Sequence, residues 1–93
     1  MSLIVSRHPA AIAFARSYER FCDAEVIEQA TEDQVRGKVV AGNLPLHLAC
    51  RCAQYFAIEL PQVVLEQRGK ELTIDEMRAA GARLVCYYVV REE

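Results

Sequence analysis

The sequence has no tryptophan, few prolines and glycines, and no apolar run near the roughly 20 residues of a membrane-spanning helix. It also lacks the long apolar segment of an N-terminal secretory signal, so we expect a cytoplasmic protein without membrane contact. The formal net charge of −2 excludes the broad positive potential with which proteins coat DNA or RNA. We therefore expect no long nucleic acid as a partner, although two or three well-placed arginines would suffice for a small phosphate ligand.

Several catalytic and metal-binding patterns are absent as well. The sequence has no glycine-rich phosphate-binding loop and no cysteine–histidine nucleophile pair. Its acidic pairs, Glu32-Asp33 and Asp75-Glu76, are typical of the first turns of helices. Zinc-ribbon spacing is absent from the four cysteines, which are Cys22, Cys50, Cys52 and Cys86. We interpret them as free thiols, with a metal site as the minor alternative, and expect neither a metal nor a cofactor.

What the sequence does contain is an alternation of short apolar segments with amphipathic ones. The predicted strands cover residues 3–5, 24–28, 38–42, 55–60 and 84–90. The predicted helices cover residues 9–20, 43–54 and 73–80, with a single turn at 31–36. In the first helix the predicted packed face includes Ala15 and Tyr18.

This order predicts one α/β domain over residues 1–93, with three layers and a mostly parallel sheet. The direction of the last strand stays open. The hydrophobic content of 53% is high for 93 residues, so a partner subunit could cover part of the apolar surface.

One pattern occurs twice in the chain. Residues 5–13 and 41–49 both run from a strand through a short polar loop and a proline into a helix. Because the carboxyl ends of parallel strands share one edge of a sheet, both loops would lie at that edge, and they would flank one crevice if the two strands are neighbours. Free N–H groups at a helix start favour an anion, above all a phosphate.

The first loop carries the candidate catalytic residues Ser6, Arg7 and His8. Arg7 offers a fixed fork of donors to a phosphate, and the hydroxyl of Ser6 could orient it. Alternatively, Ser6 is only a helix N-cap and Arg7 a solvated loop residue. His8 could act as a general acid or base near neutral pH, or be polar filling.

The second loop and a later basic segment carry the candidate substrate-binding residues. Gly42 would let a ligand approach the backbone and Asn43 would hydrogen-bond a base or a phosphate, with a plain turn as the alternative. Arg68 lies in a basic segment that is either a lip over the crevice or a surface loop. The full set of candidates is Pro9, Gly42, Asn43, Leu44, Pro45, His47 and Arg68; for His47 a core or surface role is favoured.

These residues also resemble a known family. The resemblance rests on segments 5–9, 11–12, 42–49, 68–72 and 81–84 together with Met77, and it covers nearly the whole chain. The chain is similar to a small single-domain family of type III CRISPR accessory proteins, which are counted among the CRISPR-associated ring nucleases. It departs from the family pattern at Ala10, where glycine is expected, and at Asn43, where a small hydroxyl residue is more usual.

The resemblance implies a Rossmann-like fold akin to the domains that sense cyclic oligoadenylates. It further implies a homodimer that binds cyclic tetra-adenylate and cleaves it without a metal, which switches off the antiviral signal. In this chemistry a ribose 2′-OH of the substrate attacks the adjacent phosphorus and leaves 2′,3′-cyclic phosphates. A non-catalytic module that senses or sequesters a cyclic nucleotide is the alternative, and an interaction protein with an empty crevice is a third.

Overall fold

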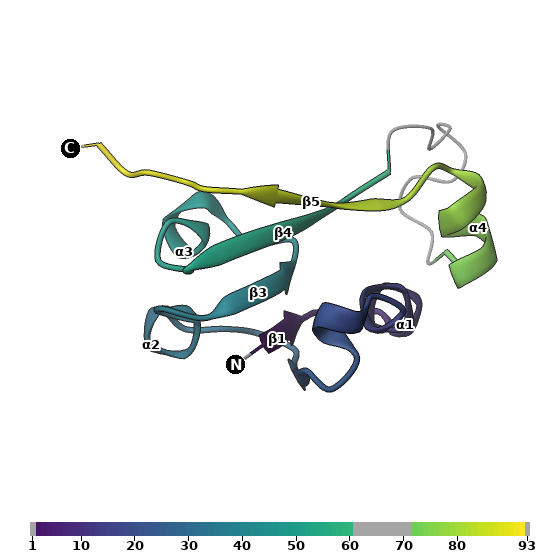
Figure 1. The fold of residues 1–93 in the computed structure, drawn as a ribbon, viewed down its shortest axis with the longest axis horizontal. Helices are drawn as coiled ribbons and strands as arrows, with labels where there is room; N and C mark the ends of the chain where they lie inside the picture. Colours follow the sequence, from purple (N-terminus) through teal and green to yellow (C-terminus); the bar gives the residue numbers. More distant parts are fainter. Residues whose placement is uncertain (1, 61–71, 93) are drawn as a thin grey trace.

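The computed structural model describes residues 2–60 and 72–92, which form a five-stranded sheet with helices on both faces (Figure 1). The strand order is β2-β1-β3-β4-β5. The bounds are β1 Ser2–Val5, β2 Glu25–Ile27, β3 Val39–Gly42, β4 Gln54–Glu59 and β5 Arg83–Tyr87. The first four strands are parallel, and β5 runs antiparallel to β4. The predicted mostly parallel, Rossmann-like sheet is therefore confirmed, and the last strand is its antiparallel edge.

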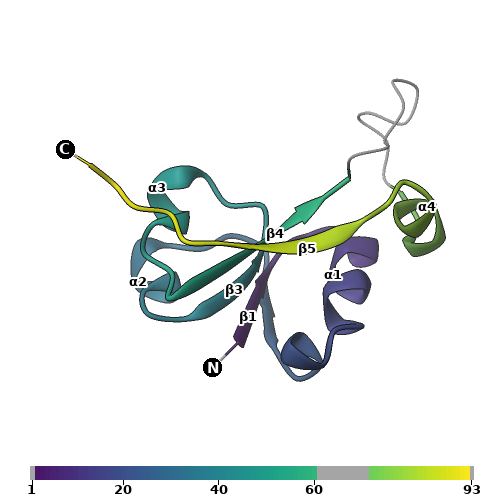
Figure 2. The same ribbon diagram turned by 45° about the horizontal axis from the view of Figure 1, so that its top comes forward.

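The helices make the two outer layers. Their bounds are α1 Pro9–Arg16, α2 Glu32–Val35, α3 Leu46–Ala49 and α4 Ile74–Ala79, with a short 3-10 helix, η1, at Glu19–Phe21. Figure 2 shows α1 and α4 together on one face of the sheet and α2 and α3 on the other. Within the described residues no helix combines the length and apolarity needed to cross a membrane.

Strand β1 lies at the centre of the core because it is buried on both faces. Ile4 packs towards α1 with Ala15, whereas Leu3 and Val5 pack on the other face with Val35. A strand buried on both sides has a continuous apolar run rather than an alternating one, and Leu3, Ile4 and Val5 form such a run.

Helix starts were predicted better than helix ends. Thr31 and Thr73 each form a capping box, in which the threonine hydroxyl accepts from the backbone amide of Gln34 or Glu76. The first helix was predicted to end at residue 20 but ends at Arg16. At the next residue, the Ser17 hydroxyl donates to the Phe14 carbonyl at 2.6 Å.

Two further predictions about the helices were wrong. The helix predicted over residues 43–54 is a single turn, α3. Because the first helix ends early, Tyr18 is not part of its packed face. Tyr18 is exposed, and its ring makes a T-shaped contact with the ring of Phe14.

Gly42 lies at a close contact between β1 and β3. Its φ of 142° lies in the region that side chains avoid, and a Cβ added there would lie 2.3 Å from the Val5 carbonyl oxygen. At Gly37, φ is also positive, at 72°, but an added Cβ would meet nothing within 4 Å. The close approach of β1 to β3 thus accounts for glycine at position 42.

Gly42→Ala should therefore lower the free energy of unfolding by about 2–4 kcal/mol, because it adds a steric clash to backbone strain. Gly37→Ala is the matched control and should cost only about 1 kcal/mol, from strain alone. Urea denaturation of both variants measures the difference. Equal losses would show that the contact with Val5 does not require glycine.

Candidate functional site

The two repeated loops meet at the carboxyl edge of the parallel strands. Strands β1 and β3 are neighbours, and their last residues, Val5 and Gly42, are paired in register. The loop of residues 6–8 and the loop of residues 43–45 therefore leave the sheet side by side. In open α/β sheets this edge is where ligands bind.

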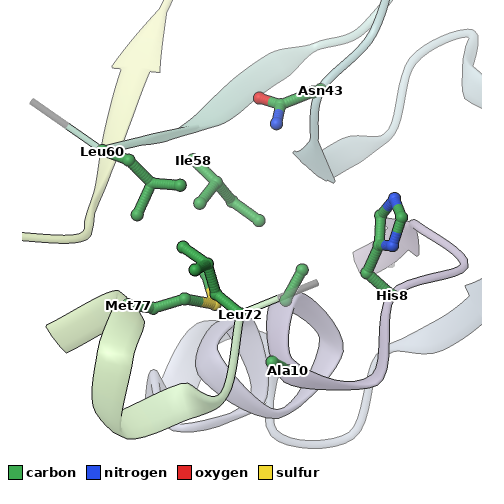
Figure 3. Close-up of a pocket in the computed structure, with 8 residues that line it drawn as sticks. His8, Ala10, Asn43, Ile58, Leu60, Leu72 and Met77 are labelled. Carbon is green, nitrogen blue, oxygen red and sulfur yellow. The ribbon is translucent and has the colours of Figure 1, made fainter. Parts of the chain in front are cut away.

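An open cavity of about 170 Å³ lies beside these loops, between α1, β4 and α4. Figure 3 shows His8 and Asn43 along one side of it, and Leu60 and Met77 on the other. The lining residues are His8, Ala10, Ala11, Asn43, Ile58, Leu60, Leu72 and Met77. An apolar wall with two polar side chains at one edge fits a flat, mostly apolar group that carries hydrogen-bonding atoms on its rim.

Asn43 is held by the backbone around it. With the nitrogen and oxygen of its amide exchanged relative to Figure 3, the nitrogen donates to the carbonyls of Ile58 at 3.3 Å and Gly42 at 3.2 Å. The opposite orientation would place three oxygens together. In this orientation the amide oxygen of Asn43 takes the position of the nitrogen drawn in Figure 3, on the side that faces the cavity, where it can accept a hydrogen bond.

The start of α1 supplies donors to the same cavity. The N-cap is His8, whose side chain makes no capping hydrogen bond, and the helix continues with Pro9 at its first position. The amides of Ala10 and Ala11 fall in the first turn, where the helix offers no acceptor, and both residues line the cavity. The eight-residue helix α1 therefore presents a suitable end to an anion.

Ser6 and Arg7 lie on the loop rather than in the cavity lining. The Ser6 hydroxyl accepts from the amide of His8 at 3.1 Å, so Ser6 shapes the loop and does not cap α1, contrary to the alternative weighed above. Arg7 is exposed and makes no ion pair with any described residue, whereas Arg36 and Arg51 both pair with Glu32. Its guanidinium is accordingly available to an external anion at this edge.

The second loop is fixed from β4 by a residue that the sequence analysis did not select. The amide of Leu44 donates to the hydroxyl of Tyr55 at 2.9 Å, and burial raises the pKa of Tyr55. Leu44 also packs against the core cluster that includes Val5. The sequence signal that could have identified Tyr55 is a tyrosine at a buried strand position, because a buried hydroxyl needs a hydrogen-bond partner.

The opposite face of the sheet carries a charged cluster at the same end of β4. Glu59 pairs with Arg83 at 3.3 Å and accepts from the Tyr87 hydroxyl, and this hydrogen bond raises the pKa of Tyr87. Side chains alternate along a strand, so Glu59 points away from the cavity that Ile58 lines. The negative charge of Glu59 is thereby kept on the other face.

The structure does not bring all the predicted residues to this cavity. His47 is exposed on α3 and lines a separate hollow with Leu46, Cys50 and Val90. Since α3 has one turn only, the second loop does not end in a helix long enough to attract an anion. Pro45 is the exposed N-cap of α3. Arg68 lies outside the described residues.

The cysteines are free thiols in the structure, and no cluster of three or more potential metal ligands occurs in residues 2–60 and 72–92. Cys22 and Cys86 are exposed, whereas Cys52 is half-buried and its Sγ donates to the Leu48 carbonyl at 3.7 Å. Burial raises the pKa of the Cys52 thiol, with the neighbouring Cys50 adding to the effect.

The fold and the cavity together define a small α/β protein with a candidate ligand site at the carboxyl edge of its parallel strands. The chain belongs to the family described as "Putative CRISPR-associated protein (Cas_VVA1548)", whose model matches residues 3–90. It is therefore a CRISPR-associated protein, which confirms the broader part of the resemblance. No curated protein and no solved structure matches the chain.

The raised pKa of Cys52 has a direct consequence for its reactivity. Because the thiolate is the reacting form, Cys52 should be alkylated by iodoacetamide more slowly at pH 8 than the exposed Cys86. Its rate should also rise at higher pH. Variants that retain one cysteine each, followed by mass spectrometry, measure both rates. Equal rates over the same pH range would contradict the burial seen here.

Proposed function

We propose that this protein is a ring nuclease that binds cyclic tetra-adenylate and cleaves it at a homodimer interface, switching off type III CRISPR signalling. Membership of a CRISPR-associated family supports this direction. The observation that carries the proposal is the pairing of β1 with β3. This pairing brings the loop that carries Arg7 and His8 beside the loop that carries Asn43, and His8, Asn43 and the first turn of α1 line the cavity next to these loops.

The cavity suits the base of one nucleotide. An adenine has two apolar faces and a rim of nitrogen atoms, and its exocyclic amine is a donor. The faces would contact Ile58 and Met77, while the amide oxygen of Asn43 would accept from the amine. A base held there has its ribose and phosphate outside, towards the loop of residues 6–8.

The phosphate then meets the donors of the first loop. Arg7 supplies two parallel N–H groups, and the amides of Ala10 and Ala11 supply two more. These groups hold the phosphate in the ground state and stabilise the additional negative charge that forms on it during displacement.

The reaction needs no nucleophile from the protein. The ribose 2′-oxygen attacks the adjacent phosphorus and loses its proton; the bond from phosphorus to the 5′-oxygen breaks, and this oxygen gains a proton. The products are a 2′,3′-cyclic phosphate and a 5′-hydroxyl, with no net consumption of water. His8 is the cavity residue that can take up or deliver a proton, and the alignment of the three reacting atoms supplies much of the rate.

A second copy of the chain completes the site in this proposal. A cyclic tetranucleotide can have two-fold symmetry, which matches the symmetry of a homodimer. Directly after the second loop, Leu46 is 73% exposed, an apolar side chain suited to a protein partner.

One observation favours the alternative, a module that binds the cyclic nucleotide without cleaving it. The hydroxyl of Ser6 already accepts from the His8 amide, and Arg7 lies outside the cavity lining. Chromatography of cyclic tetra-adenylate after incubation with the protein separates the two functions. Linear products support the nuclease, and recovery of intact ring with a raised melting temperature supports the binding module.

Arg7→Ala should lower the rate of cleavage of cyclic tetra-adenylate by about 10²–10³-fold, because it removes donors to the phosphate. Chromatographic assays at saturating protein measure the rate. Arg36→Ala is the matched control: it removes another exposed arginine, which precedes β3 at the opposite edge of the sheet. Full activity of the Arg7 variant would remove Arg7 from the mechanism.

Cleavage should be unchanged in the presence of EDTA, because the substrate provides the nucleophile and the protein donors stabilise the charge. The same chromatographic assay is run with the chelator and with added Mg²⁺. Activity that disappears with EDTA and returns with Mg²⁺ would contradict a mechanism based on these residues alone.

A further inference from the structure

The loop of residues 43–45 is attached to the sheet by three separate contacts. Because Gly42 has no side chain, the loop can start against the Val5 carbonyl. The side-chain amide of Asn43 donates to the Ile58 carbonyl. The third contact is the hydrogen bond from the Leu44 amide to the Tyr55 hydroxyl. It is the only one of these three contacts that depends on a side chain outside the loop.

Tyr55 is well placed to act as a fixed support. It lies on β4, paired with Val40 on one side and Tyr87 on the other, and only 7% of its surface is exposed. A buried side chain on a strand that is paired on both sides has little freedom, so its hydroxyl is a rigid acceptor. Its partner, Leu44, is the immediate neighbour of Asn43.

We propose that Tyr55 is a positioning residue for the candidate site: by accepting the Leu44 amide, its hydroxyl holds Asn43 at the polar edge of the cavity. The ligand part of this inference rests on the proposed function. Phenylalanine would fill the same core volume, so packing alone does not account for a hydroxyl here. A buried hydroxyl is costly unless it is bonded, and this one is bonded to a loop and not to a strand or helix.

Tyr55→Phe removes the acceptor and leaves the ring. In the protein without ligand, the Leu44 amide should exchange its hydrogen about tenfold faster, because one hydrogen bond has been lost. The matched control is Tyr88→Phe, which removes a hydroxyl that accepts from Gln54 at 2.7 Å and should leave Leu44 unchanged. Unchanged exchange at Leu44 in Tyr55→Phe would overturn the proposal, whether or not any ligand binds.

The positioning role is then separated from a general loss of stability by a double-mutant cycle. Tyr55→Phe and Asn43→Ala should each weaken binding of cyclic tetra-adenylate by about tenfold, and the double variant should bind no more weakly than Asn43→Ala alone. Losses that simply add would show that Tyr55 does not act through Asn43 and would overturn the proposal.

The two experiments also separate this proposal from the proposed function. If the wild-type protein neither binds nor cleaves the cyclic nucleotide, the proposed function fails, and so does the ligand role of Tyr55. The exchange of Leu44 still decides whether Tyr55 holds the loop.

Discussion

The pairing of β1 with β3 determines where the candidate site lies in this protein. Both strands are buried and end at the same level, with Val5 opposite Gly42. Because residue 42 is a glycine, β3 can end immediately beside the Val5 carbonyl. Consequently two polar loops that are about 35 residues apart in the sequence leave the sheet together, which is the arrangement that open α/β sheets use for ligands.

Much of the fold could be predicted because its signals are local. The apolar run at residues 3–5 specifies a strand buried on both faces, and Thr31 with Gln34 specifies a helix start through two reciprocal hydrogen bonds. The ends of helices were less predictable. α3 stops after one turn, while its sequence continues with residues compatible with a helix.

The candidate site was predictable in its location but less so in its chemistry. The repeated strand–loop–proline–helix pattern predicted that the two loops meet at one edge of the sheet, as they do, and His8 and Asn43 line the cavity beside them. However, half of the cavity wall comes from Ile58, Leu60, Leu72 and Met77, none of which was among the candidate site residues. Only tertiary packing brings α4 against α1, so no local pattern could show that the site is mostly apolar. The hydrogen bond between Tyr55 and Leu44 also depends on tertiary packing, so it could not be predicted from local sequence.

The size of the cavity gives the strongest argument for a second copy. At about 170 Å³ it is smaller than the roughly 300–1,000 Å³ typical of small-molecule pockets, so it can enclose one base but not a ring of four nucleotides. The proposed substrate therefore needs binding surface beyond this chain. An unrelated partner could supply it only by matching the other half of the ring independently, whereas a symmetric copy repeats the same cavity, the same Asn43 and the same Arg7. A two-fold dimer is therefore the assembly that we propose for the binding of cyclic tetra-adenylate.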